Sequence, residues 1–186
     1  NVKTEFFLKA NELVKKRYEL KTLNFTNNKD IMPYVDQMFD LFNASYANLS
    51  SFVAITDVQK EYFKKKYISF INPEYIKFIM DKENNMVAFS IVMPSFSEAL
   101  QKAKGKLFPF GFYHILRSQK KTKRLSLLLG AVRKDHRRSG IDTMLGISLL
   151  KETTKAGLNV IDSHLEMEKN TQVRAEMEKI GGEVYK

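Results

Sequence analysis

The segment that decides the fold is Leu125-Ser-Leu-Leu-Leu-Gly-Ala-Val-Arg-Lys-Asp-His-Arg-Arg-Ser-Gly-Ile-Asp-Thr-Met-Leu145. Its apolar beginning predicts a buried strand over Arg124–Val132, and the apolar-faced run that follows predicts a helix over Ser139–Lys155 that Gly157 ends. The first turn of a helix leaves backbone N–H groups unpaired and partly positive, which favours a bound anion. Gly140 lies at this point and lets a phosphate approach the backbone without a Cβ in the way. The segment therefore predicts a phosphate-binding loop between a strand and a helix.

The charge of the whole chain agrees with this prediction. The 186 residues have a formal net charge of +10 at pH 7, and Lys and Arg crowd into Lys102–Arg138. Arg137 and Arg138 fall inside the predicted loop. This bias favours an anionic partner, which is a phosphorylated cofactor, a nucleic acid or an acidic surface. A solvated basic surface explains most of the other basic side chains equally well.

Length and composition exclude several classes. A chain of this length fits one domain with a real core. The absence of cysteine excludes disulfides, thiolate metal sites and a cysteine nucleophile, and it is compatible with the cytoplasm. No apolar run of about 20 residues exists, so no membrane span is expected. The start at Asn1 lacks an initiator Met and the shape of a signal peptide, so we interpret the chain as part of a longer protein.

Helical and strand-like periods alternate along the rest of the chain. Helices are expected over Thr4–Tyr18, Asp30–Tyr46, the stretch from the capping box Thr56-x-x-Gln59 to about Tyr67, a short stretch opened by Ser95-x-x-Glu98, Phe110–Ser118 and Asn170–Ile180. Strands are expected over Glu19–Phe25, Tyr75–Met80, Met86–Met93, Val160–Leu165 and Glu183–Lys186. The order β-α-α-β-β-(αα)-β-α-β-α-β predicts an α/β fold, in the α+β sense of a mixed sheet with helices on both faces.

The predicted loop resembles the acyl-CoA-binding loop of the GNAT (Gcn5-related N-acetyltransferase) superfamily. That family has Arg/Gln-x-x-Gly-x-Gly/Ala after its fourth strand, and Arg137 and Gly140 match this pattern. The later segment 170–181 is similar to the family's Asn-x-x-Ala-x-x-x-Tyr-Glu-Lys-x-Gly. The element order matches as well, and the similarity covers about Arg17–Lys186.

The resemblance implies an N-acyltransferase of the GNAT fold. An unknown amine would attack acetyl-CoA or another acyl-CoA directly, without a covalent enzyme intermediate. The residues implied in cofactor binding are Ala131, Val132, Arg133, Arg137, Arg138, Ser139, Gly140, Ile141 and Asn170. Glu166 is a candidate base acting through water, or else part of an ordinary acidic loop, and Tyr185 is a candidate acid. His114, His136 and His164 have no ligand-like spacing, so no metal site is expected.

The sequence also departs from the family pattern. Asp142 stands where the loop has its last Gly or Ala, and Arg138 where Gly commonly follows the Arg. Met177 stands where a Tyr often protonates the leaving thiolate, and the strand Arg124–Val132 holds no carboxylate base. Ser139-x-x-Asp142 reads as a capping box that would fill the helix N-terminus with the protein's own carboxylate. Pointed into the loop, Asp142 would repel a phosphate at about 4 Å by about 4 kcal/mol. Pointed outward, it would leave the site intact.

A closer likeness is to the C-terminal half of bacterial proteins with two tandem GNAT-like modules, and Ser95–Arg117 carries it. Residues 1–16 are then a linker or a helix from an upstream module, and residues 17–186 are a single GNAT-like domain with a helical insertion at 94–123. The aromatic residues of the insertion either shape an acceptor pocket or pack it onto the protein.

Three functions remain open from the sequence. The first is acyl transfer, and the second is a catalytically inactive GNAT-fold module with a binding or scaffolding role beside the upstream module. The third is nucleic-acid binding through Lys120–Arg138, which has the charge but no recognised reader motif. The sequence does not identify the acceptor, the acyl group or the oligomeric state.

Overall fold

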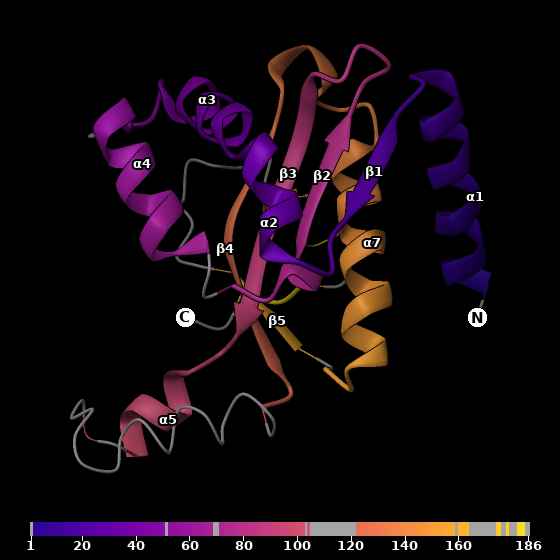
Figure 1. The fold of residues 1–186 in the computed structure, drawn as a ribbon. Coiled ribbons are helices and arrows are strands. Elements are labelled where there is room, and N and C mark those ends of the chain that lie inside the picture. The colour runs from indigo at the N-terminus through magenta and orange to yellow at the C-terminus, as the bar shows by residue number, and fades with distance from the viewer. Residues whose placement is uncertain are drawn as a thin grey trace.

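The protein folds around one five-stranded sheet with strand order β1-β2-β3-β4-β5 (Figure 1). This computed structural model describes residues 2–50, 52–68, 71–102, 104, 122–158, 160–163, 174–175, 178 and 182–184. The strands are β1 (Lys21–Asn24), β2 (Ile76–Met80), β3 (Met86–Pro94), β4 (Arg124–Val132) and β5 (Val160–Asp162). Each of the strands β1 to β3 pairs antiparallel with the next one along the chain, and β5 pairs parallel with β4. The expected mixed sheet is confirmed.

Helices lie on both faces of this sheet (Figure 1). They include α1 (Val2–Arg17), α2 (Asn28–Ile31), α3 (Val35–Tyr46), α4 (Asp57–Lys66), α5 (Ser97–Lys102) and α7 (Ile141–Lys155), with 3-10 turns at Met32–Tyr34, Pro73–Tyr75 and Lys134–His136. The α3 helix contacts β3 and β4, whereas α7 contacts β2 and β3 from the opposite face and carries α1 on its outer side. This arrangement puts the loop after β4 at the top of the sheet in Figure 1.

Apolar side chains fill both sides of the sheet. The core below α3 includes Met38, Phe78 and Phe89, and the core below α7 includes Ile141 and Met144. Burying each such side chain contributes about 1.5–3 kcal/mol. The sequence periods that predicted the helices therefore reflect packing on the sheet.

A polar pair interrupts the core below α7. Lys77 of β2 is only 1% exposed, and its Nζ donates to Asn24 Oδ1 at 2.9 Å. Ser90 lies opposite Lys77 in β3 and is also buried. Burial lowers the pKa of Lys77, because the charged ammonium is removed from water.

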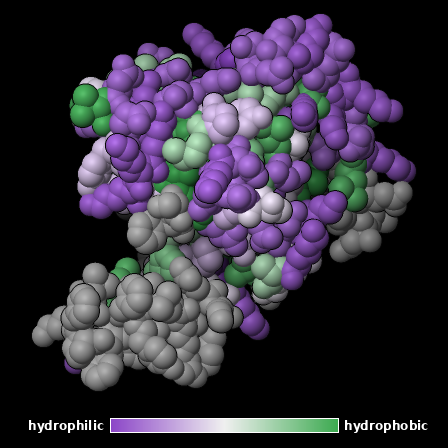
Figure 2. All heavy atoms as spheres, in the orientation of Figure 1, coloured by the Kyte–Doolittle hydropathy of each residue, from purple (hydrophilic) through white to green (hydrophobic). Residues whose placement is uncertain are grey.

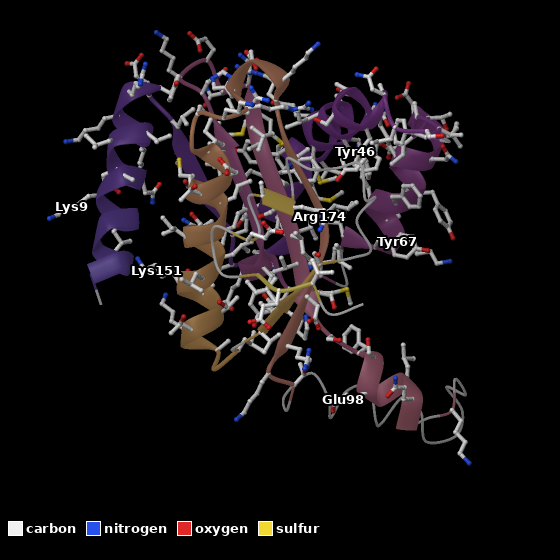
Figure 3. The ribbon with its side chains drawn as sticks, turned by 180° about the vertical axis from the view of Figure 1, so that it is seen from behind. Lys9, Tyr46, Tyr67, Glu98, Lys151 and Arg174 are labelled. Carbon is white, nitrogen blue, oxygen red and sulfur yellow. The ribbon has the colours of Figure 1, made fainter. Side chains whose placement is uncertain are left out.

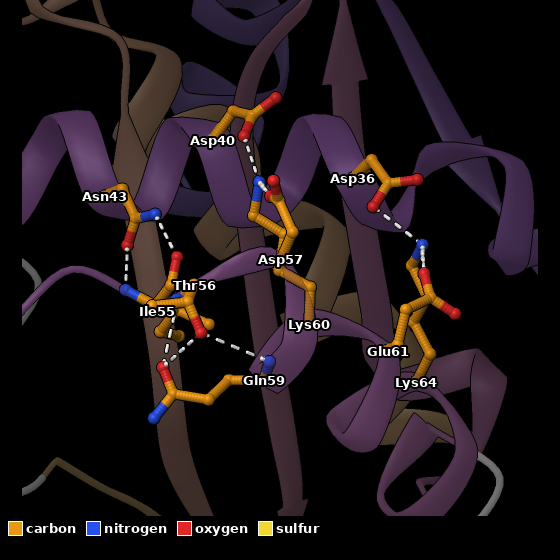
Figure 4. A network of polar contacts seen from close by, with 10 residues as sticks. All are labelled: Asp36, Asp40, Asn43, Ile55, Thr56, Asp57, Gln59, Lys60, Glu61 and Lys64. Atoms are coloured by element: carbon orange, nitrogen blue, oxygen red, sulfur yellow. Dashed lines mark hydrogen bonds and ion pairs between the residues drawn. The ribbon is translucent and has the colours of Figure 1, made fainter.

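Polar contacts join α4 to α3 (Figure 4). Lys64 Nζ lies 2.7 Å from Asp36 Oδ1, and Lys60 Nζ lies 2.7 Å from Asp40 Oδ1. The predicted capping box at the start of α4 is confirmed, since the side chains of Thr56 and Gln59 each accept from the other's backbone N–H.

Some expected boundaries are wrong for local reasons. The helix expected over Asp30–Tyr46 is divided, because Pro33 lies at the start of a 3-10 turn between α2 and α3. The short helix expected from Ser95 begins at Ser97. Glu183 and Val184 are not in a strand. The helix expected over 110–118 lies outside the described residues, as does most of the one expected over 170–180.

The boundaries of β4 match the expected strand, and α7 ends before Gly157, which has φ 70. In the described ranges, no helix combines the length and the apolar character that a membrane span requires.

Candidate functional site

The upper part of β4 has an edge without a partner strand in the described part of the chain. The pairing with β5 covers Arg124–Ser126 of β4 only, and Ser163 is already outside the strand. On the other edge, β3 pairs with β4 up to Val132. The register shifts so that Leu128 is an extra residue in β4, which is a β-bulge. Residues 164–173, which follow Ser163 along the chain, lie outside the described residues.

The register with β3 determines which backbone groups face this open edge. Arg133 donates its backbone N–H to Val87 O at 2.8 Å, and Val132 lies opposite Ala88. In an antiparallel ladder, hydrogen-bonded pairs alternate with pairs whose N–H and C=O groups point away from the partner strand. The backbone groups of Val132 and Gly130 therefore point toward the edge that β5 leaves open.

Side chains occupy both carbonyl groups on this edge. The Tyr46 hydroxyl donates to Gly130 O at 2.9 Å, and Arg137 Nε donates to Val132 O at 3.3 Å. The N–H groups of Gly130 and Val132 face the same edge, where no described strand accepts from them. At these two residues the edge offers hydrogen-bond donors, which suits a ligand carbonyl or a developing oxyanion.

The amides at the start of α7 continue this set of donors. Gly140 is the N-cap of α7, with φ 87 and no side-chain cap. Met144 makes the first helical hydrogen bond, from its N–H to Gly140 O at 3.1 Å. The N–H groups of Ile141, Asp142 and Thr143 find no acceptor among the described residues. An anion is favoured at such a helix end by these donors and by the helix dipole.

The capping box expected at Ser139 and Asp142 is wrong. The left-handed turn at Gly140 makes that residue the N-cap and leaves Ser139 outside the helix. The Ser139 hydroxyl instead donates to His136 O. Asp142 is partly buried in the first turn of α7, and its carboxylate caps no helix N–H. Arg138 has φ 62, a left-handed conformation at the position where the resemblance places glycine.

Exposed basic side chains surround these donors. Lys134, Arg137 and Arg138 are all exposed in the loop between β4 and α7. The surface over the top of the sheet, where this loop lies, is hydrophilic (Figure 2). The loop therefore combines positive side chains with amides that have no acceptor in the described part of the chain.

Arg133 anchors the loop to the turn between β2 and β3. Its guanidinium donates to Asp135 Oδ1 at 2.9 Å and to Asp81 Oδ2 at 3.2 Å. The hydrogen bond between His136 and Asp135, supported by Arg133, lowers the pKa of Asp135 to about 2. Arg133 and Asp135 also line an open surface hollow together with Lys134. Two carboxylates thus already neutralise Arg133, which the sequence placed among the cofactor residues.

The end of α1 covers the other side of the loop. Val14 packs with Ile141 in the core below α7, and the ring of Tyr18 lies 5.7 Å from that of His136. Arg17 lies over the Tyr18 ring, with 5.5 Å between its Cζ and the ring centroid. The expected N-terminal helix is therefore packed against the loop and α7.

The remaining predicted site residues fall into two groups. Ala131 is buried in the core below α3, and Ile141 is completely buried below α7, so these two offer backbone groups only. Asn170, Glu166, Tyr185 and Met177 lie outside the described residues. No group of three or more His, Asp or Glu side chains is placed to hold a metal ion in the described ranges.

Sequence reasoning missed the role of Tyr46. Its helical spacing with Val35, Met38, Phe39 and Phe42 predicts a place on the apolar face of the helix, which is correct as far as it goes. Its hydroxyl, however, reaches a carbonyl 84 positions further along the chain. The one signal in the sequence is the nature of tyrosine itself, because a buried tyrosine ring needs a hydrogen-bond partner for its hydroxyl.

Comparison with solved structures shows which class of fold this is. The chain is similar to an aminoglycoside acetyltransferase, meta-AAC0020 from an uncultured soil metagenomic sample, solved with sisomicin, with a TM-score of 0.57, 15% identity and coverage of 92% of this chain and 95% of that one. It is similar to aminoglycoside N-acetyltransferase AAC(6')-Iy in complex with CoA, with a TM-score of 0.56, 10% identity and coverage of 90% and 88%. The ribosomal-protein-S18-alanine N-acetyltransferase from Escherichia coli gives a TM-score of 0.53, 14% identity and coverage of 87% and 76%. The chain has the GNAT acetyltransferase fold.

One curated protein is a distant relative of the chain by sequence. Protein YghO of Escherichia coli (strain K12) is 23% identical over 173 residues, which cover 89% of this chain. The chain spans only 44% of the length of that protein. No family model matches the chain.

Proposed function

We propose that this domain is a GNAT-type N-acyltransferase that moves an acetyl or other acyl group from acyl-CoA to an amine. One observation supports this most. The N–H groups of Gly130 and Val132 on the edge of β4 are followed, after the loop, by the N–H groups at the start of α7, and neither set has an acceptor among the described residues. A ligand with carbonyl groups at one end and phosphates at the other would pair with both sets. Acyl-CoA is such a molecule. The use of acyl-CoA also favours a cytoplasmic location for the protein.

The residues of the loop would bind the phosphates. The amides of Ile141, Asp142 and Thr143 would donate to the pyrophosphate, with Arg137 and Arg138 adding positive charge. Ser139 and Gly140 would contribute close backbone approach. The solved structure of a similar fold that contains CoA supports this choice of ligand.

The β4 edge would act on the carbonyl groups. The N–H groups of Gly130 and Val132 would hold the thioester carbonyl and the pantetheine arm, and Asn170 would contact that arm. The amine nitrogen attacks the thioester carbon, the new C–N bond forms and the C–S bond breaks. The amine proton passes to a base and the thiolate takes a proton, for which Glu166 and Tyr185 are the candidates.

Calorimetric titration of the domain with acetyl-CoA tests this function. We expect saturable binding, which Arg137→Ala weakens at least about tenfold, because a charge-assisted contact to phosphate contributes about 1.5–3 kcal/mol. Lys21→Ala is the matched control, since Lys21 is an exposed cation at the start of β1. No heat and no thermal shift at millimolar acetyl-CoA would rule out the proposal.

A second candidate is a GNAT-fold module without catalysis, serving as a binding half beside an upstream GNAT-like module. Met177 supports it, because methionine has no proton to give a leaving thiolate. The greater length of protein YghO supports a further module. This version predicts acetyl-CoA binding without release of free CoA thiol in the presence of a panel of amines, and thiol release would exclude it.

A further inference from the structure

Tyr46 joins the end of α3 to the open edge of β4 (Figure 3). It is the last residue of α3, it is partly buried, and its hydroxyl lies 2.9 Å from Gly130 O. Its ring stacks on Phe42 with 4.6 Å between the centroids and lies 6.1 Å from Phe52. Because packing fixes the ring, the hydroxyl is held at one place on the strand.

The helix that carries Tyr46 is itself held by polar contacts along its length. Asp36 and Asp40 pair with Lys64 and Lys60 of α4 at an exposed surface, where the two aspartates are 60% and 67% exposed (Figure 4). One turn before Tyr46, the Asn43 amide bonds both backbone groups of Ile55 at 2.9 Å. The α3 helix is thus a firm support for Tyr46.

The Tyr46 hydroxyl occupies an acceptor that a neighbouring strand would use. In a complete parallel ladder, Gly130 O would accept an N–H from the next strand. Among the described residues, the pairing of β4 with β5 ends at Ser126, and at Gly130 a side chain supplies a donor. Strand pairing beyond Ser126 would therefore compete with this hydroxyl for the Gly130 carbonyl, which already has a donor without a strand.

We propose that Tyr46 is a positioning residue of the site: its hydroxyl keeps the β4 edge free of strand pairing and holds the N–H groups of Gly130 and Val132 toward the acyl donor. This inference rests on the proposed acyl-CoA function. Tyr46 acts through the backbone of Gly130 and carries no proton in the reaction.

Amide hydrogen exchange in the ligand-free domain tests the first half of the proposal. Tyr46→Phe keeps the ring and removes the hydroxyl, and Tyr67→Phe is the matched control, on the C-cap tyrosine of α4 that is 48% exposed (Figure 3). We expect exchange at Gly130 and Val132 to slow at least fivefold in Tyr46→Phe, because the freed edge can pair. Tyr67→Phe leaves these rates unchanged. Unchanged or faster exchange at the two amides in Tyr46→Phe would overturn the proposal.

Two ligands separate positioning from general loosening. Acetyl-CoA engages the edge of β4 and the loop, whereas adenosine 3′-phosphate 5′-diphosphate, its nucleotide part, engages the loop alone. We expect Tyr46→Phe to weaken acetyl-CoA about tenfold and to leave the affinity for the nucleotide unchanged. Equal weakening of both ligands would overturn a positioning role, because it would mean that the whole site had loosened.

The two readouts also separate this inference from the proposed function. If the wild-type domain bound no acetyl-CoA while Tyr46→Phe still slowed exchange at Gly130 and Val132, the transferase proposal would fall and the role of Tyr46 in keeping the edge open would stand. If acetyl-CoA bound equally to wild type and Tyr46→Phe, the transferase proposal would stand and the positioning role would fall.

Discussion

Val14 of α1 lies directly against Gly140, the N-cap of α7: a Cβ built on Gly140 would come within 3.1 Å of Val14 Cγ2. Gly140 also has φ 87, which side chains other than glycine rarely adopt. The backbone conformation therefore requires glycine at this position, and the packing of α1 also favours it. The glycine that the proposal places beside the phosphates is thus the same residue that gives Val14 of α1 room to pack.

Gly140→Ala is expected to lower the free energy of unfolding by about 1–2 kcal/mol, because a left-handed alanine is strained by about that amount. The close Val14 contact adds to the cost unless that side chain shifts. Urea unfolding followed by circular dichroism measures the change.

Gly146→Ala is the matched control within the same helix. Gly146 is exposed in the middle of α7, and a Cβ there would meet nothing within 4 Å. Alanine should raise the free energy of unfolding by up to about 1 kcal/mol, since it has the higher helix propensity. If both variants shifted stability in the same direction, Gly140 would not be a constrained position.

The lowered pKa of Asp135 predicts that the stability of the fold falls in acid, through the loop after β4. Its pKa is lowered to about 2, first by the hydrogen bond with His136 and then by Arg133, from the usual 3.8. A depressed folded-state pKa stabilises the fold above pH 3.8 and loses that contribution as the pH falls toward 2. We expect the urea midpoint of wild type to fall more steeply over this window than that of Asp135→Asn.

Other carboxylates titrate in the same window, so the comparison needs a neutral reference. Glu12→Gln removes an exposed acid of α1 that makes no ion pair with the described residues. Its pH profile should parallel wild type. A profile of Asp135→Asn that also paralleled wild type would show that the pairing with His136 and Arg133 is absent in solution.

Lys77 is expected to cost stability at neutral pH. It is 1% exposed, its Nζ donates to Asn24 and it lies opposite Ser90 on the sheet. Burial lowers its pKa, against the smaller opposing effect of Glu152 and Glu74. A lysine with a lowered folded-state pKa destabilises the fold where it must be charged, and stability rises as the pH approaches 10.5. Lys77→Met should therefore raise the free energy of unfolding at pH 7 by about 1 kcal/mol, with a smaller gain near pH 10.

Lys151→Met is the control for this lysine prediction. Lys151 is exposed on α7 (Figure 3), so its replacement should change stability by less than about 0.5 kcal/mol at either pH. A loss of stability in Lys77→Met would instead mean that the hydrogen bond to Asn24 outweighs the cost of burying the ammonium.

The sequence predicted the elements whose signal is local. The apolar run of β4, the capping box at Thr56 and the stop at Gly157 each depend on residues close together in the chain, and all are confirmed. The start of α7 was misjudged, because Ser139 and Asp142 have the spacing of a capping box but Gly140 turns left-handed between them. A local motif failed there because backbone conformation decided which residue became the cap.

Contacts between distant segments were beyond the reach of the sequence. Three contacts join residues that no sequence periodicity relates. They are the hydrogen bond from Tyr46 to Gly130, the ion pair of Arg133 with Asp81 and the packing of Val14 against Gly140. Together these contacts fix the loop after β4 and the edge of β4 beside it, which the loop sequence alone does not show. Chemistry-bearing residue types were visible in the sequence, whereas the pairing that directs them depends on the fold.

Asp142 is the acidic residue nearest to the amides that the proposal assigns to the phosphates. Its carboxylate lies in the first turn of α7 and caps no helix N–H, so its charge is unscreened by a capping bond. We expect Asp142→Asn to tighten CoA binding about threefold to tenfold, because removing a negative charge within several ångströms of a phosphate relieves repulsion of about 1 kcal/mol at a partly buried site that water still screens. The gain should shrink at 1 M salt, which screens such charges.

Stability should move in the opposite direction in the same variant. A negative side chain in the first turn interacts favourably with the helix dipole. Asp142→Asn is therefore expected to lower the free energy of unfolding by about 0.5 kcal/mol, while it raises affinity for CoA. Glu152→Gln, near the other end of α7, is the control and should leave CoA affinity unchanged. Calorimetric titration and urea unfolding of the same preparations measure the two effects. Lower stability with unaltered affinity would place the Asp142 carboxylate away from the phosphates, so that it serves the helix and not the ligand.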